Sequence, residues 1–221
     1  MEAMNRKYPV GIQTFERVRE EGYLYIDKTD LVWEMTKESP FVFLSRPRRF
    51  GKSLLTTTLS SYFKGQKELF EGLKIMALEK EWESYPVIHL DLSVTKAETS
   101  VEGFRNVLFR LLEYYKNIYG EGAYEDTPGG RLSGIIHRAY EKTGKQVVVI
   151  IDEYDAPLLD KLHENGVLND FSDNFSGLIV LHGVDFFQRR RSANQHVARH
   201  RKFRRSCGIL FCKIYSRYNS R

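Results

Sequence analysis

The chain has 221 residues, of which 42% are hydrophobic and 29% are charged, so it can form one well-packed globular domain with an appendage. It contains no run of about 20 apolar residues that would cross a bilayer, and its first residues lack the apolar core of a signal peptide. We therefore expect a cytoplasmic protein that does not contact a membrane. Its two cysteines, Cys207 and Cys212, support neither a disulfide framework nor a zinc site, because no histidine pair accompanies them at finger spacing.

The net charge of +5 is distributed unevenly along the chain. Residues 186–221 contain nine Arg and two Lys but no Asp or Glu, which gives this segment a charge of +11. The first 185 residues hold the other 23 of the 34 basic residues and all 29 acidic ones, a charge of −6. An acidic body therefore carries a basic tail, and such a tail can neutralise the phosphates of a nucleic acid.

The N-terminal part predicts a short strand and a helix. Residues 23–29 alternate between apolar and polar side chains, as in a strand, and Thr29 or Asp30 is suited to cap a helix over residues 31–37. Two roles remain open for three polar residues of this segment: contact with a nucleotide, or a structural role in closing the domain, which we favour. These residues are Tyr25, Asp27 and Lys28.

Residues 41–55 have the pattern of a buried strand, a basic turn and a helix. Gly51 lets the backbone come close to phosphates, Lys52 can reach the β- and γ-phosphates, and the Ser53 hydroxyl can hold Mg²⁺. The N–H groups and the dipole at the start of the helix favour an anion at the same place. The stretch therefore predicts a phosphate-binding loop, although Arg46 stands where the P-loop signature has its first glycine.

The middle of the chain predicts further helices and one more strand. Apolar residues at helical spacing after the loop indicate a helix packed on the sheet. The remaining elements are a strand over residues 86–92, an amphipathic helix over 101–119, an exposed loop over 120–130 and a helix over 131–143. We interpret His89 as a core or edge histidine. Asp91, near the end of its strand, is expected to face solvent, with the nucleotide-binding edge as the alternative.

A second motif lies a hundred residues after the loop. Residues 146–151 form a continuous run rich in β-branched side chains, as in a parallel strand that is covered on both faces, and Asp152 and Glu153 follow it directly. Open α/β sheets bind ligands at the C-terminal ends of their strands. This is the arrangement of a Walker B strand, in which Asp152 would hold Mg²⁺ and Glu153 could polarise the attacking water.

The pattern changes towards the C-terminus. Pro157 begins a further helical piece, and residues 171–183 are expected to continue as helix. Beyond Asp185 the chain has neither strand alternation nor a clear helical stripe, and residues 207–215 form a lone apolar patch.

Three of these motifs together resemble the bacterial AAA-ATPase-like family. They are the segment Tyr25–Thr29, the loop Arg46–Ser53 and the stretch Val149–Pro157. The resemblance covers residues from about 8 to 185. It implies a P-loop ATPase in which an arginine-rich loop takes the place of the glycine-rich one and the catalytic glutamate directly follows the Walker B aspartate. It also implies that a nuclease-like domain often follows the ATPase domain.

Motifs and resemblance together predict an α/β fold with a P-loop NTPase-like parallel sheet flanked by helices, incomplete at its C-terminus. The expected cofactors are ATP and Mg²⁺. Lys52 and Glu153 are the catalytic candidates, and Ser53 and Asp152 are the metal ligands. The residues expected to surround the nucleotide are Arg46, Pro47, Arg48, Arg49, Phe50, Gly51, Lys52, Ser53 and Leu54.

The basic tail departs from the family pattern. In this class a further strand with a polar sensor residue lies between the P-loop strand and the Walker B strand, and here the tail stands in its place. Our hypothesis is that residues 1–185 are a partial ATPase domain. Residues 186–221 would then be a poorly structured product of a frameshift or a gene-model error, and the sheet would have a gap at its centre.

Three functions remain open from the sequence. The first is Mg²⁺-dependent hydrolysis of ATP at the motifs above. The second is a nucleic-acid-binding module that acts through the basic tail. The third is a non-catalytic remnant that binds nucleotide without turnover. The sequence predicts neither the oligomeric state nor a macromolecular partner beyond a nucleic acid.

Overall fold

A computed structural model describes most of the chain. The described residues are 7–38, 41–47, 49–97, 100–123, 125–153 and 206–214. The expected helical pieces at Pro157 and at residues 171–183 lie outside these ranges. No helix of the described part is long and apolar enough to cross a membrane.

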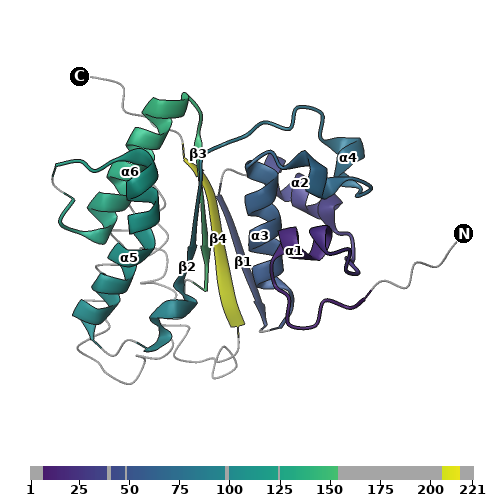
Figure 1. Cartoon of the computed structure of the whole chain (residues 1–221), viewed down its shortest axis with the longest axis horizontal. Helices are drawn as coiled ribbons and strands as arrows, with labels where there is room; N and C mark the ends of the chain where they lie inside the picture. The colour runs from purple at the N-terminus through teal and green to yellow at the C-terminus, as the bar shows by residue number, and fades with distance from the viewer. Residues whose placement is uncertain are drawn as a thin grey trace, which may run out of the picture.

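One sheet forms the middle layer of the fold (Figure 1). Its strands are β1 (Phe41–Pro47), β2 (Val87–Asp91), β3 (Val147–Asp152) and β4 (Ser206–Ile214), in the spatial order β1-β4-β3-β2. β2 and β3 pair in parallel, whereas β4 is antiparallel to both of its neighbours. β1, β2 and β3 therefore run in one direction, and their C-terminal ends meet at the lower edge of the sheet in Figure 1. The predicted parallel pairing is present, but the sheet as a whole is mixed.

β4 occupies the place where the sequence indicated a gap. Part of the basic tail forms this strand, which pairs along its length with β1 on one side and β3 on the other. Ser206 pairs with Pro47, and Ile209 pairs with Asp152. Residues 207–214 of the lone apolar patch therefore belong to an inner strand of the sheet. The unpaired N–H and C=O groups of β1 and β3 gain partners in this way, which matters because unpaired backbone groups inside a fold are costly.

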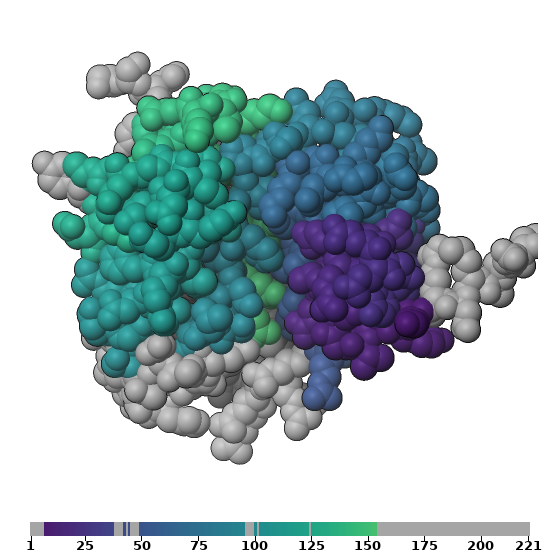
Figure 2. All heavy atoms as spheres, viewed as in Figure 1, coloured from purple at the N-terminus to yellow at the C-terminus, as the bar shows by residue number. Residues whose placement is uncertain are grey.

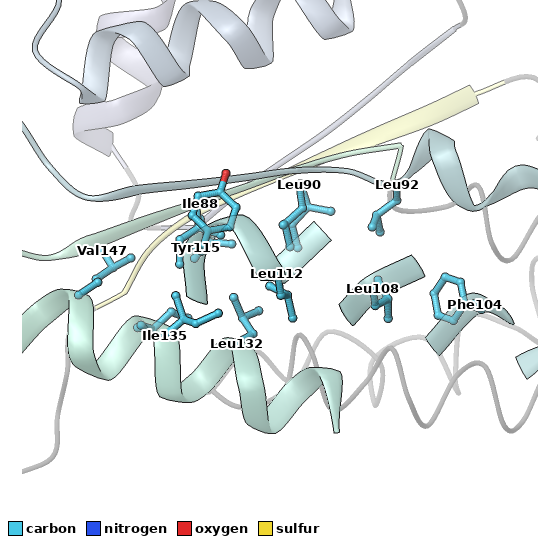
Figure 3. Packing of buried hydrophobic residues seen from close by; sticks show 14 residues of the cluster. Ile88, Leu90, Leu92, Phe104, Leu108, Leu112, Tyr115, Leu132, Ile135 and Val147 are labelled. Carbon is cyan, nitrogen blue, oxygen red and sulfur yellow. The ribbon is translucent and has the colours of Figure 1, made fainter. Parts of the chain in front are cut away.

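Two helices cover one face of the sheet. They are α5 (Val101–Tyr119) and α6 (Pro128–Thr143), and their N-terminal N–H groups are capped by the hydroxyls of Ser100 and Thr127. Ile88, Leu90 and Leu92 point from β2 and the turn after it into this layer, as Figure 3 shows. The facing residues of the helices are Phe104, Leu108, Leu112, Leu132 and Ile135. The apolar stripe predicted for residues 101–119 is confirmed as core. α6, however, begins three residues earlier than predicted, because Thr127 caps it and Pro128 starts it.

The opposite face is covered by α3 (Lys52–Phe63) and the N-terminal elements. These are α1 (Phe15–Glu20), α2 (Thr29–Glu38), η1 (Lys67–Phe70) and α4 (Ile75–Leu78). In the space-filling view, α1 and the residues before it lie on the outer surface of this layer (Figure 2). Phe15 and Phe70 are fully buried beneath that surface, with ring centroids 4.8 Å apart.

β3 is buried on both faces, as predicted for a strand between two helical layers. Val147, Val149 and Ile151 pack towards α5 and α6, whereas Val148 and Ile150 pack towards α3. By the same alternation Asp152 lies on the α3 face.

Residues 23–28 are not a strand, so that prediction is wrong. Their polar side chains bind neighbouring segments instead of alternating across a sheet. Both carboxylate oxygens of Asp27 accept hydrogen bonds: Oδ1 from the Thr29 backbone N–H (2.9 Å) and Oδ2 from the Lys74 backbone N–H (2.8 Å). The Thr29 hydroxyl in turn accepts the backbone N–H of Ile75. The segment therefore holds the start of α4 against the start of α2.

Candidate functional site

The candidate site begins where β1 passes into α3. A short loop follows Pro47, and α3 starts at Lys52. Gly51, just before the helix, has a φ of 72°, a left-handed conformation that strains any residue with a β-carbon. α3 starts at the end of the loop that follows β1, so the N-terminus of the helix lies near the C-terminal edge of the sheet. This local geometry favours an anion there.

The first turn of α3 carries two of the predicted site residues, Lys52 and Ser53. Lys52 is only 5% exposed although it is charged, so it lies inside the edge of the fold rather than on the surface. Ser53 is half-buried, and its hydroxyl counteracts the burial that raises the pKa of the Asp152 carboxyl, so the two side chains lie near each other. The two motifs, which lie about a hundred residues apart in the sequence, thus meet at one point.

The Asp152 carboxylate is held from several sides and is 3% exposed. Its Oδ1 accepts the backbone N–H of Glu153 at 2.9 Å, and its Oδ2 lies 3.4 Å from the hydroxyl of Thr56. The Thr56 hydroxyl also lies 2.9 Å from the carbonyl oxygen of Ser53. Thr56 was not predicted from the sequence. Thr56 follows Lys52 by four residues, about one helical turn, and this spacing predicts that the two side chains lie on the same face of α3.

Burial is the largest influence on Asp152, and it raises the pKa of this carboxyl above its ordinary value of 3.8. The nearby Ser53 hydroxyl opposes this increase in the pKa. The negative charges of Asp91 and Glu153 then raise the pKa further. A carboxylate that is buried next to other carboxylates is destabilised in its charged form, so this place favours a bound cation.

Backbone strain is concentrated at the same edge. Of the three non-glycine residues with positive φ among those described, two are Arg49 (67°) and Glu153 (53°). Residues held in such conformations cost about 1–3 kcal/mol and cluster at functional sites. Arg49 stands in the loop before α3, and Glu153 directly follows Asp152, so both lie where the sequence places the phosphates.

The other predicted site residues are placed less closely together. Arg49 and Phe50 are exposed, Phe50 by 64%, and Leu54 packs against the hydrophobic cluster under α3. The side chains of Arg46, Pro47 and Arg48 lie outside the described residues.

The N-terminal candidates have structural contacts. Asp27 holds the start of α4, as described above. Burial raises the pKa of the Tyr25 hydroxyl, and its ring lies 5.2 Å from that of Phe15 in an edge-to-face arrangement. Lys28 is exposed. These contacts support the structural role that we favoured for Tyr25 and Asp27.

The donor set fits magnesium. The Ser53 hydroxyl and the Asp152 carboxylate are hard oxygen ligands, and in nucleotide sites Mg²⁺ binds one or two carboxylates together with the phosphates of the substrate. Across the described ranges no group of three or more His, Cys, Asp and Glu side chains gathers to hold a metal ion by itself. An ion at this place would therefore depend on a bound phosphate to complete its coordination.

The sequence is similar to a known protein family. A model described as a predicted AAA-ATPase matches residues 9–200. The chain belongs to the AAA-ATPase-like family. The resemblance stated from the motifs is thus confirmed, and the match continues beyond residue 185 into the basic tail.

One curated relative of this AAA-ATPase-like chain is an uncharacterized protein in the vnfD 5′ region of Azotobacter chroococcum mcd 1. It is 34% identical over 179 residues, which are 78% of this chain and 34% of the relative. The chain thus spans about a third of the length of the curated relative that it matches. No solved structure matches the chain.

Proposed function

We propose that the chain binds ATP with Mg²⁺ at the C-terminal edge of its sheet and hydrolyses it. The observation that carries the proposal is that Ser53, at the start of α3, lies near the buried Asp152, at the end of β3, whose Oδ2 is 3.4 Å from the hydroxyl of Thr56 in α3. A P-loop site needs these two oxygen ligands side by side next to a helix N-terminus. Family membership supports nucleotide as the ligand.

Each residue has a distinct role in the proposed reaction. Lys52 binds the β- and γ-phosphates, and Ser53 and Asp152 hold the magnesium ion. That ion, when bound, neutralises charge that develops on the phosphates. Glu153 orients the attacking water and accepts its proton. Arginines of the loop, Arg46, Arg48 and Arg49, add phosphate or partner contacts, and Pro47, Phe50, Gly51 and Leu54 complete the surroundings of the nucleotide.

The P-loop NTPase-like character of the sheet belongs to the same proposal. β1 and β3 run in the same direction on either side of β4, so the loop after β1 and the acids after β3 open at one edge. Ligands of open α/β sheets bind at that edge.

Turnover can be separated from binding with two variants. Lys52→Ala is expected to bind ATP at least about tenfold more weakly and to lose hydrolysis. Glu153→Gln is expected to keep binding and to lower the hydrolysis rate by about 10²–10⁴-fold, the typical contribution of a general base. If the wild-type chain binds ATP but shows no turnover above that of Glu153→Gln, the chain is the non-catalytic remnant instead.

The tail supports nucleic-acid binding as a second candidate function, because residues 186–221 carry a charge of +11. Deleting the whole tail would also remove β4 from the middle of the sheet. Replacing Arg189, Arg190 and Arg191 by glutamine avoids this. If the tail binds phosphates through these arginines, the plot of log K for DNA binding against log[salt] becomes less steep, with a slope smaller in magnitude by about 3. The affinity for ATP is unchanged. An unaltered slope would contradict this role for these arginines.

The division into a partial ATPase domain over 1–185 and a tail of altered reading frame remains our proposal. The loss of every acid after residue 185 supports it. Sequencing the locus and its transcript tests the proposal. A continuous reading frame without family-like sequence downstream would contradict it.

A further inference from the structure

Asp91 lies beside the candidate site but belongs to neither sequence motif. It is the last residue of β2, and in the parallel pairing of β2 with β3 its register partner is Asp152. Neighbouring strands are about 4.8 Å apart, so the backbones of the two aspartates are separated by about that distance. The pairing therefore brings a second acid to the edge at which Asp152 contacts α3.

Asp91 also lies on the same face of the sheet as Asp152. In β2, Val87 packs towards α3, whereas Ile88 and Leu90 pack towards α5 and α6. Because side chains alternate along a strand, Asp91 is on the α3 face with Val87. The phosphate-binding helix and both carboxylates therefore share one side of the sheet.

The carboxylate of Asp91 is exposed and oriented by the backbone. Its Oδ1 accepts the N–H of Ser93 at 2.8 Å, at the point where β2 turns into η2 (Leu92–Ala97). That turn is itself fixed, since Leu92 is fully buried and its carbonyl oxygen accepts the Thr95 hydroxyl at 2.6 Å. Asp91 is thus held at the edge of the sheet while it remains accessible to water.

We propose that Asp91 is a positioning residue for the magnesium ion of the site and that it accepts hydrogen bonds from the waters that the ion keeps. The inference rests on the proposed function. Mg²⁺ releases its waters reluctantly and usually retains several in protein sites, so acceptors beyond the direct ligands orient it. Asp152 and Ser53 supply the direct ligands, and Asp91 is the adjacent acceptor on the same face.

The test is the Mg²⁺ dependence of nucleotide binding in the full chain. A fluorescent ATP analogue is titrated into wild type and Asp91→Asn at a series of Mg²⁺ concentrations and in EDTA. Substitutions of residues that orient metal ligands typically weaken metal affinity 10–100-fold. We expect at least a tenfold increase in the Mg²⁺ concentration for half-maximal binding in Asp91→Asn, with no loss of affinity in EDTA.

Two further variants make the result specific. Asp126→Asn removes the same charge from an exposed position on the α5 and α6 side and is expected to leave the Mg²⁺ dependence unchanged. Asp91→Glu keeps a carboxylate, so its Mg²⁺ concentration for half-maximal binding is expected to lie between those of wild type and Asp91→Asn. Because asparagine can still accept the Ser93 N–H, the thermal unfolding midpoint of Asp91→Asn should match that of wild type.

The outcomes distinguish the two proposals. An equal Mg²⁺ dependence in wild type and Asp91→Asn would overturn the role of Asp91 and leave the proposed function intact. Failure of the wild-type chain to bind the nucleotide at any Mg²⁺ concentration would overturn both.

Discussion

Replacing Glu79 by glutamine is expected to destabilise the protein by about 3 kcal/mol at pH 7, and by about half as much at pH 3. Glu79 directly follows α4 and is 7% exposed. It accepts a hydrogen bond from the Tyr62 hydroxyl of α3, and its Oε2 lies 3.3 Å from Nζ of Lys37 in α2. The carboxylate thus joins the helix that carries Lys52 to two other elements of its layer.

The magnitude follows from the pKa of Glu79. Burial would raise this pKa, but hydrogen bonds from Tyr62 and from the Glu81 backbone, together with the charge of Lys37, outweigh burial and lower it from 4.5 to about 2. The difference of about 2.5 pKa units corresponds to about 3 kcal/mol at 1.36 kcal/mol per unit. Because the folded-state pKa is the lower one, this stability is complete above about pH 5 and is lost as the pH falls towards 2.

The assay is urea-induced unfolding of wild type and Glu79→Gln at pH 7, 5 and 3. The difference in the free energy of unfolding should be about 3 kcal/mol at pH 7 and pH 5 and about 1.4 kcal/mol at pH 3. Glu83→Gln is the matched control, since Glu83 is exposed and accepts only a surface hydrogen bond from Tyr85. Its effect should stay within about 0.5 kcal/mol. A Glu79→Gln difference that is the same at all three pH values would refute the reasoning.

Three other substitutions test separate parts of the structure. Gly134→Ala would place a β-carbon 1.9 Å from Oε1 of Glu125, so we expect the free energy of unfolding in urea to fall by about 1–3 kcal/mol. Stability equal to that of wild type would show that the loop that carries Glu125 can move aside. Asp27→Ala removes the acceptor of two backbone N–H groups, so the free energy of unfolding should fall by about 1–3 kcal/mol while the affinity for ATP stays the same. Weaker ATP binding in a folded variant would instead support contact between Asp27 and the nucleotide. Asp152→Asn should raise the melting temperature of the nucleotide-free protein at pH 7, because the pKa of Asp152 is raised in the folded state and its ionised form is destabilising at that pH. The same variant should lose Mg²⁺-dependent nucleotide binding. A lower melting temperature would contradict this.

The layers of the fold could be predicted from local patterns. The β-branched run of β3 required burial on both faces, and the apolar stripe of α5 required a sheet to pack against; both are found. The alternation of apolar and polar side chains in residues 23–28 wrongly predicted a strand. Asp27 and Thr29 instead bind backbone N–H groups at the start of α4, more than 40 residues away. Alternation along the sequence carries no information about such long-range hydrogen bonds.

The position of β4 could not be predicted for a similar reason. Its nine residues are apolar enough for a strand, but their place depends on the unpaired edges of β1 and β3, which are remote in sequence. Within the site, Lys52, Ser53 and Asp152 follow from the order of the motifs. Thr56 does not, and for Asp91 this edge was only the alternative to solvent. The register of β2 with β3 places Asp91 beside Asp152, and the turn of α3 brings Thr56 to the same carboxylate.

The most direct measurement is a calorimetric titration of ATP with Mg²⁺ into wild type, Lys52→Ala and Lys64→Ala. Lys64 is an exposed lysine at the other end of α3 and serves as the matched control. A hydrogen bond to a charged group contributes about 1.5–3 kcal/mol, so Lys52→Ala should bind ATP at least about tenfold more weakly than wild type. Lys64→Ala should bind like wild type. Equal affinity in wild type and a folded Lys52→Ala would contradict a nucleotide site at the start of α3.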